Sequence, residues 1–317
     1  MAADLLIISG FLGAGKTTLI KKLITEGFKN ENVVIIENDF GDTSVDASLL
    51  RTPNIEVKEL SSGCICCSLS GDFVRSLLDV LKRFRPTKIL IEPSGVSKVS
   101  DIIKSCSDPR VRKLASLKTV ITVVDAKRCK RHLNNFGEFF EDQIKNADVI
   151  LLSHTEASPD SENDARLLAK SLNERSAIIA VPWQQLTPEQ ILAPEAALLS
   201  ASHTYNRQDQ GKKSCNHKED CCCRNHSANE VFETLTIKAQ HKYSVNDLKN
   251  RVREMEHHEN GTILRVKGIV PGVNGYINLQ YVPGETVLTS TTVTGNDVCI
   301  IGRNLDRNRL MRIFNGE

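Results

Sequence analysis

Eight residues near the start of the chain have the types and spacing of a phosphate-binding loop. They read Gly-Phe-Leu-Gly-Ala-Gly-Lys-Thr over 10–17 and fit the pattern G-x-x-x-x-G-K-[ST] without a mismatch. The backbone amides of such a loop surround phosphate oxygens, its lysine reaches the β- and γ-phosphates, and its last hydroxyl binds Mg²⁺. We therefore expect nucleotide contacts from Gly10, Gly13, Ala14, Gly15, Lys16, Thr17 and Thr18, with Lys16 also catalytic and Thr17 on Mg²⁺.

A second group of candidate residues follows the apolar run 88–91. Glu92 ends this run and lies three residues before Gly95. A carboxylate at this point of a nucleotide-hydrolysing protein holds Mg²⁺, so we expect a catalytic role for Glu92, and the amide of Gly95 is placed to meet the γ-phosphate. The alternative for Glu92 is an ordinary carboxylate at a strand end. Asp125 also ends an apolar run, and we interpret it as a cap on the next helix.

The segment that should recognise the base follows the apolar run 149–152. Guanine is commonly bound by Asn-Lys-x-Asp, but here the chain reads Ser-His-Thr-Glu over 153–156. Glu156 can still accept from guanine N1 and N2, and His154 can stack where the lysine stem would lie. Ser153 is a poor substitute for the asparagine. The segment predicts a preference for guanine that rests on other side chains than the usual Asn-Lys-x-Asp. ATP stays open as the alternative nucleotide.

Seven of the ten cysteines fall in two clusters, and the first cluster is a turn with Cys64, Cys66 and Cys67. Closely spaced thiolates suit soft ions such as Zn²⁺, Co²⁺ or Cu⁺ better than Mg²⁺. Three thiolates alone leave a site incomplete, so the bound ion would be exchangeable, which favours delivery over a structural role. A redox dithiol and a tight turn of small residues are the alternatives.

The second cluster lies in a polar segment without apolar periodicity. Its soft ligands are Cys215, His217, Cys221, Cys222, Cys223 and His226. We interpret them as an accessory metal-capture site, because four cysteines in so short a polar stretch are improbable by composition. A disordered tether with incidental cysteines is the alternative. The remaining Cys106, Cys129 and Cys299 have apolar neighbours and are expected in the core.

The elements that must position these residues alternate between strands and helices. Strands are expected at 5–9, 33–36, 55–60, 88–91, 120–124, 149–152 and 177–181, with helices at 17–26, 73–84, 136–147 and 160–173. This order predicts an α/β domain of the P-loop NTPase type, with a mostly parallel sheet, over 1–200. A Cys/His-rich flexible linker is expected at 201–230. Strand-like runs with two helices predict a smaller α+β domain over 231–317.

The composition excludes several classes of partner. The 317 residues carry 41 basic and 39 acidic side chains, a net charge of +2, so neither nucleic acid nor a membrane surface is an expected partner. The apolar runs are all too short for a spanning helix. The first residues lack the basic stretch that opens a signal peptide, and clustered cysteines outside secreted proteins suit metal binding, so we expect a cytoplasmic protein.

Several motifs, in the same order along the chain, resemble those of the CobW-type GTPases, which are metal-handling GTPases related to HypB and UreG. The segments are SGFLGAGKTT at 9–18, ENDFG at 37–41, ELSSGCICC at 59–67, IEPSG at 91–95 and GTILRVKG at 261–268. The last of these resembles the second domain of the family. The resemblance therefore covers nearly the whole chain apart from the linker.

The resemblance implies a GTP-dependent metal chaperone or insertase, which would bind Zn²⁺ or Co²⁺ at the first cysteine cluster and release the ion on GTP hydrolysis. It also implies that Glu37 lies near this turn and joins the metal or the Mg²⁺ shell, and that Asp46 helps to position the attacking water. A plain exposed carboxylate is the alternative for both. The client would be a metalloprotein or a protein of a cobalamin-type pathway, and a homodimer is compatible with the resemblance.

Two other functions stay open at this point. In a metal store or sensor, the linker would be the working part and the nucleotide site would be regulatory. A P-loop small-molecule kinase would need an acceptor pocket and a lid, and beyond the linker the sequence offers neither. The sequence names neither the metal nor the client.

Overall fold

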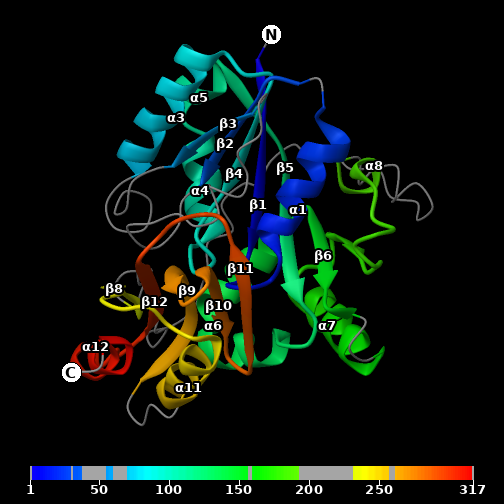
Figure 1. Cartoon of the computed structure of the whole chain (residues 1–317). Coiled ribbons are helices and arrows are strands. Elements are labelled where there is room, and N and C mark those ends of the chain that lie inside the picture. Colours follow the sequence, from blue (N-terminus) through cyan, green and yellow to red (C-terminus); the bar gives the residue numbers. More distant parts are fainter. Residues whose placement is uncertain are drawn as a thin grey trace, which may run out of the picture.

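The computed structural model describes residues 2–29, 31–37, 55–59, 70–155, 159–192, 231–256 and 261–315. Two sheets organise these residues, a larger parallel one formed before residue 180 and a smaller antiparallel one formed after residue 232. Figure 1 shows the larger sheet in the upper part of the molecule and the smaller sheet below it.

The larger sheet has the strand order β3-β2-β4-β1-β5-β6-β7, and every pair of neighbours runs parallel. Its strands are β1 (Ala3–Gly10), β2 (Val33–Glu37), β3 (Ile55–Glu59), β4 (Lys88–Glu92), β5 (Ala115–Asp125), β6 (Val149–Ser153) and β7 (Ala177–Ile179). Strands of a parallel sheet are buried on both faces, which explains the nearly continuous apolar runs of β1 and β2. The predicted α/β fold with a mostly parallel sheet is confirmed.

Helices cover both faces of this sheet. One face carries α1 (Lys16–Lys22), the π-helical turn η1 (Leu23–Gly27) and α8 (Pro188–Leu192). The other carries α3 (Ser70–Phe84), α4 (Val99–Cys106), α5 (Pro109–Arg112), α6 (Cys129–Lys145) and α7 (Pro159–Leu172). The helix expected at 136–147 begins earlier, at Cys129, and its backbone is non-helical at Phe136. The break in regular geometry falls at the residue where the predicted helix begins.

The smaller sheet has the order β11-β10-β9-β12-β8, with antiparallel neighbours throughout. Its elements are β8 (Glu233–Lys238), α11 (Val245–Glu256), β9 (Thr262–Gly272), β10 (Gly275–Val282), β11 (Glu285–Thr291), β12 (Asp297–Arg303) and α12 (Arg307–Asn315). Both helices pack on one face, where Leu248, Val252 and Leu310 join the apolar cluster of the sheet. The expected second, α+β unit is therefore present.

The other face of the smaller sheet packs against the N-terminal part of the chain. Leu264 of β9 and Cys299 of β12 belong to the same buried cluster as Phe11, which lies in the phosphate-binding loop. The ring of Phe232, just before β8, lies 5.0 Å from that of Phe139 in α6, measured between centroids. Apolar contacts therefore hold the smaller sheet directly beside the loop.

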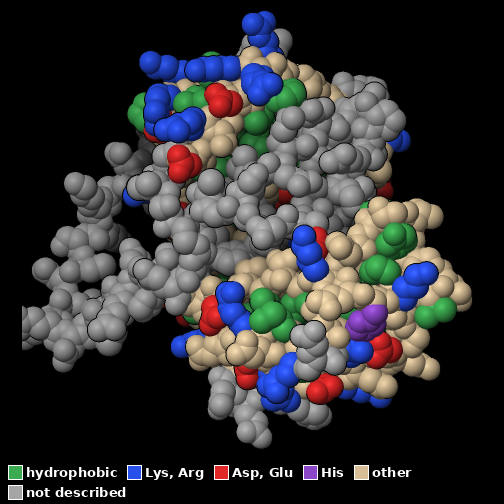
Figure 2. All heavy atoms as spheres, turned by 60° about the vertical axis from the view of Figure 1, so that its left-hand side comes forward, with side chains coloured by type: hydrophobic (Ala, Val, Ile, Leu, Met, Phe, Trp, Pro, Cys, Tyr) green, Lys and Arg blue, Asp and Glu red, His purple; other side chains and the backbone are tan. Residues whose placement is uncertain are grey.

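The three cysteines outside the clusters are buried and free, as expected for core residues. Burial raises the pKa of the Cys106 thiol to about 12, so this thiol stays protonated and unreactive. On the face shown in Figure 2, hydrophobic side chains form small separate groups among charged ones. The described part of this face therefore carries no large continuous apolar patch.

Candidate nucleotide site

The carboxyl ends of the parallel strands bring candidate residues to one edge of the larger sheet. Glu37 and Glu92 are register partners at the ends of β2 and β4, and Asp125 and Ser153 are register partners at the ends of β5 and β6. Between these two pairs, β1 runs into the phosphate-binding loop. Ligands of open parallel sheets bind at this edge, where the strand order reverses.

Three glycines give the phosphate-binding loop its backbone path. The φ angle is +144° at Gly10, +77° at Gly13 and +106° at Gly15, which side chains disfavour. A Cβ atom at Gly10 would also lie 2.3 Å from the carbonyl oxygen of Val123. The loop thus offers backbone without side chains, and α1 begins directly after it at Lys16. Such a cradle fits phosphate oxygens, as the sequence motif predicts.

Lys16 and Glu92 come together at this cradle. Nζ of Lys16 lies 4.0 Å from Oε1 of Glu92 and donates to the carbonyl oxygen of Phe11 at 3.5 Å. Both side chains are largely buried. A cation and a carboxylate in this position suit a phosphate and its Mg²⁺, the latter also within reach of a hydroxyl such as that of Thr17. Thr17 is half-buried and Thr18 is exposed.

Gly95 packs against the same loop. A Cβ atom at Gly95 would lie 2.8 Å from the backbone nitrogen of Leu12. The carbonyl oxygen of Gly95 accepts a 3.1 Å hydrogen bond from Nε2 of the buried Gln143. The turn after β4 is therefore fixed beside the cradle, at a distance that only glycine allows. A backbone amide at this position, next to the phosphate-binding loop, is suited to contact a γ-phosphate.

A lysine of the smaller sheet adds a charge that sequence reasoning missed. Lys267 lies on β9 opposite Cys299 of β12, and it is 0% exposed. Burial lowers the pKa of Lys267 to about 8, while Cys299 and Glu37 raise it and the charge of Lys16 lowers it. Lys267 therefore lies within electrostatic reach of the cradle. Its sequence signal is weak, because a lysine at an alternate position of a strand is usually solvated.

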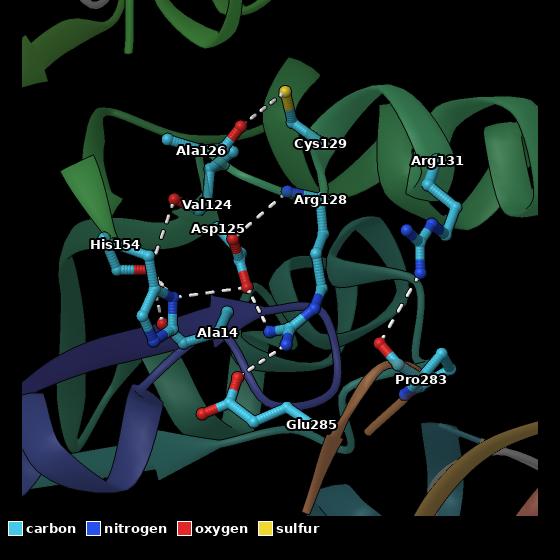
Figure 3. A network of polar contacts seen from close by, with 11 residues as sticks. Ala14, Val124, Asp125, Ala126, Arg128, Cys129, Arg131, His154, Pro283 and Glu285 are labelled. Carbon is cyan, nitrogen blue, oxygen red and sulfur yellow. Dashed lines mark hydrogen bonds and ion pairs between the residues drawn. The ribbon is translucent and has the colours of Figure 1, made fainter. Parts of the chain in front are cut away.

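Asp125 is the centre of a network of charged side chains, drawn in Figure 3. Its Oδ2 accepts from Nη1 of Arg128 at 2.7 Å and lies 3.2 Å from Nδ1 of His154. Its Oδ1 accepts from the backbone amide of Arg128, so the interpretation as a cap accounts for one of three contacts. Burial alone would raise the pKa of Asp125, but His154 and Arg128 outweigh it and lower the pKa. The carboxyl is therefore ionised.

His154 follows β6 in a left-handed backbone conformation, with φ +55°, and its side chain is 43% exposed. The hydrogen bond to Asp125 raises the pKa of His154 against the effect of partial burial. The preceding Ser153 is buried, and its hydroxyl donates to the carbonyl oxygen of Ala14 at 2.7 Å. The expected base segment is thus tied to the phosphate-binding loop by a contact that the sequence did not indicate.

Trp183, in the segment after β7, is a further side chain close to the loop. A Cβ atom at Gly15 would lie 3.4 Å from Cζ2 of Trp183. The indole is partly buried and packs on the cluster that contains Leu19 and Leu186. It is the single tryptophan of the chain. A nucleotide in the cradle would therefore lie near a built-in fluorophore.

The remaining expected site residues lie outside the described residues: Asp46, Glu156, Cys64, Cys66, Cys67, Cys215, His217, Cys221, Cys222, Cys223 and His226. Within the described ranges, no group of three or more histidine, cysteine, aspartate or glutamate side chains is arranged to hold a metal ion. No helix in the part of the chain that the structure describes is long and apolar enough to cross a membrane.

Residues 4–180 match the family model described as CobW/HypB/UreG, nucleotide-binding domain. The sequence is 34% identical over 183 residues to the zinc chaperone YjiA of Escherichia coli, covering 55% of this chain and 56% of that protein. It is 33% identical over 178 residues to the zinc chaperone CobW of a Sinorhizobium species, covering 47% of this chain and 50% of that protein. The chain thus spans about half the length of the curated relatives that it matches.

Among solved structures, the Zn(II)-bound YjiA GTPase of Escherichia coli aligns with a TM-score of 0.46 at 18% identity. The alignment covers 100% of this chain and 99% of that chain.

Proposed function

Because the chain belongs to the CobW/HypB/UreG family, we propose that it is a GTP-hydrolysing metal chaperone. The observation that supports this most directly is the approach of Lys16 and Glu92 to 4.0 Å at a glycine cradle. Glu37 ends the neighbouring strand, in register with Glu92. A phosphate site and a carboxylate pair suited to divalent cations are therefore side by side.

In this proposal, the loop amides and Lys16 bind the β- and γ-phosphates, and the hydroxyl of Thr17 with the carboxylate of Glu92 holds Mg²⁺. The ion, when bound, neutralises charge that builds on the phosphate oxygens. Gly95 offers its amide to the γ-phosphate. Asp46 positions the attacking water. The fixed positions of Lys16, Glu92 and Gly95 support this arrangement.

We propose GTP rather than ATP as the substrate. Glu156 would accept from guanine N1 and N2, and His154 would cover the face of the base. The contact between Ser153 and Ala14 supports this proposal, because it fixes the start of the base segment relative to the phosphates. Comparing the dissociation constants of GTP and ATP tests it, and a tighter constant for ATP would contradict it.

The cargo ion is proposed to bind Cys64, Cys66 and Cys67, with Glu37 as a further ligand. The chain enters this cysteine segment from Glu59 at the end of β3, whose register partner is Glu37 on β2. In the sequence, Cys64 follows the end of β3 within a few residues. Changes at the γ-phosphate would reach the metal ligands through this edge of the sheet.

We propose Zn²⁺ as the ion, with Co²⁺ as the alternative. Thiolate ligands suit both ions, so the ligand types do not separate them. The two curated relatives described above are named zinc chaperones. The partner would be a client metalloprotein in the cytoplasm. After GTP hydrolysis, the ion would be released and transferred to this client protein.

The decisive experiment is a competition titration of Zn²⁺ and Co²⁺ with Mg·GTP and, separately, with Mg·GDP. We expect tighter metal binding with GTP, and we expect Cys66→Ala with Cys67→Ala to abolish that difference. Cys106→Ala is the matched control, because it removes a buried thiol at the end of α4. Unchanged metal affinity with Mg·GTP in the double variant would contradict the proposal.

A deletion of 214–227 separates this function from that of a metal store. A store would lose most of its metal capacity, because it depends on the second cysteine cluster. A chaperone would lose accessory capacity but keep the GTP-dependent site. Retained GTP dependence with reduced total capacity is the expected result.

A further inference from the structure

The tight turn between β10 and β11 touches the phosphate-binding loop from the other sheet. A Cβ atom at Gly13 would lie 2.7 Å from Cγ1 of Val282, the last residue of β10. In the same turn, the carbonyl oxygen of Pro283 accepts from Nη1 of Arg131 at 3.5 Å. Gly284 has a φ of +84°. The residue before it, Pro283, has its own φ fixed by the proline ring, so the backbone of the turn has little conformational freedom. A stiff piece of the smaller sheet therefore abuts the cradle.

Glu285, which begins β11, extends this contact into the charged network of Figure 3. Its Oε2 accepts from Nη2 of Arg128 at 2.6 Å, while Nη1 of the same guanidinium holds Asp125 at 2.7 Å. Arg128 and Asp125 are buried, whereas Glu285 is about half exposed, so the guanidinium is held by a buried carboxylate on one side and a partly solvated one on the other. Charge-assisted hydrogen bonds are shorter and more directional than neutral ones, and the buried contact with Asp125 is the less screened of the two.

The network ends at the expected base segment. The carboxylate of Asp125 contacts Nδ1 of His154, and the hydroxyl of the neighbouring Ser153 donates a hydrogen bond to the carbonyl oxygen of Ala14. This leaves Nε2 as the ring nitrogen of His154 that can meet a ligand. Two adjacent loop residues are thus contacted from two directions, Gly13 by Val282 and Ala14 by Ser153. The turn and the base segment are connected both through the loop and through Arg128.

We propose that the β10–β11 turn is a working part of the nucleotide site, in which Glu285 acts through Arg128 and Asp125 to position His154 for the base. The proposal rests on the proposed GTPase function and deepens it. It makes the smaller sheet a determinant of nucleotide affinity and base selectivity. Glu285 is a positioning residue, because its carboxylate contacts Arg128 rather than the ligand.

The test measures dissociation constants of GTP and ATP, and steady-state hydrolysis, for full-length wild type and Glu285→Gln. We expect the variant to weaken GTP binding by about fivefold, in line with the loss of one charge-assisted contact, while kcat changes less than about twofold. The preference for GTP over ATP falls with it. Glu254→Gln is the matched control, since Glu254 is exposed on α11, on the opposite face of the smaller sheet.

A double-mutant cycle with His154→Asn separates positioning from general destabilisation. If Glu285 acts through His154, the Gln substitution has little further effect on GTP affinity in the His154→Asn background. Independent, additive effects would overturn the proposal, as would an unchanged dissociation constant in Glu285→Gln. If the Gln variant fails to fold, Glu285→Asp replaces it in the same cycle, with an expected affinity below wild type. A wild type that binds no nucleotide would instead contradict the proposed function.

Discussion

The hydroxyl of Ser153 donates a 2.7 Å hydrogen bond to the carbonyl oxygen of Ala14, and so joins the end of β6 to the phosphate-binding loop. Both residues are buried. Ser153→Ala would leave the Ala14 carbonyl oxygen without this donor, at a cost of about 1 kcal/mol. We expect GTP to bind a few-fold more weakly, measured by calorimetry. Ser171→Ala, on the exposed side of α7, is the control, and equal affinities would show that the bond does not order the loop.

Lys16 is expected to be required for hydrolysis. Its ammonium lies at the cradle beside Glu92, so Lys16→Ala removes the cation that would neutralise phosphate charge. We expect the hydrolysis rate to fall by at least about 100-fold, the usual scale for losing one electrostatic group of a transition state. Lys21→Ala on the same helix serves as control. Substantial hydrolysis in Lys16→Ala would place the reaction elsewhere.

Gly13 is limited both by its backbone and by a neighbour. Gly13→Ala would place a methyl group 2.7 Å from Val282 at a φ of +77°, and the backbone conformation alone costs about 1–2 kcal/mol. We expect a lower melting temperature and weaker nucleotide binding. Val282→Ala in the same chain should restore the part of the loss that is due to the clash. If it restores nothing, the turn does not press on the loop.

His132 gives the protein an acid sensitivity that can be measured. It is buried among aromatic rings, 4.5 Å from Phe11 between centroids, and its Nδ1 has no hydrogen-bond partner among the described residues. Burial lowers the pKa of His132 from 6.5 to about 4. Below pH 6.5 the unfolded chain takes up a proton that the folded protein does not, so stability falls as the pH decreases towards 4.

The loss that His132 contributes amounts to about 3 kcal/mol once the pH reaches the folded-state pKa. Denaturant titrations between pH 7 and pH 4 measure it. In His132→Phe this portion of the acid dependence should disappear, because an aromatic ring still fills the site but no titrating nitrogen is present. A variant with the same acid dependence as wild type would show that other groups cause it.

Trp183 should report nucleotide binding directly. As the single tryptophan, 3.4 Å from a Cβ position at Gly15, it would respond to occupation of the cradle. We expect a saturable change in emission on adding Mg·GTP, and no such signal from Trp183→Phe. Emission that stays constant while calorimetry records binding would place the nucleotide away from this indole.

The parallel sheet and the phosphate-binding loop were predictable because their signals are local. Strands buried on both faces read as apolar runs, and the loop is one contiguous motif with glycines at the positions of positive φ. Because β1 and β4 pair in parallel, Glu92 at the end of β4 comes close to Lys16 just after β1, and predicting this requires only the order of the strands. These expectations needed only the order of elements.

The contacts from the smaller sheet were not predictable in this way. Glu285 and Arg128 are 157 residues apart, and nothing near either one indicates the other. The same holds for Lys267, whose burial depends on which face of β9 meets the loop. Alternation within a strand distinguishes two faces, but it does not say what covers them. Charged residues between two packed units therefore escape sequence patterns.

The position of β1 in the sheet has a consequence for how the protein is made. β1 is synthesised before the other described strands of its sheet, yet its neighbours are β4, which begins at Lys88, and β5, which ends at Asp125. A nascent chain that has emerged only as far as residue 87 carries the whole phosphate-binding loop and neither of the strands that hold it. The site therefore forms late, after long-range strand pairing. Nucleotide can bind only after β1 has paired with β4 and β5. During synthesis it therefore stabilises the sheet once it has formed and does not help to nucleate it.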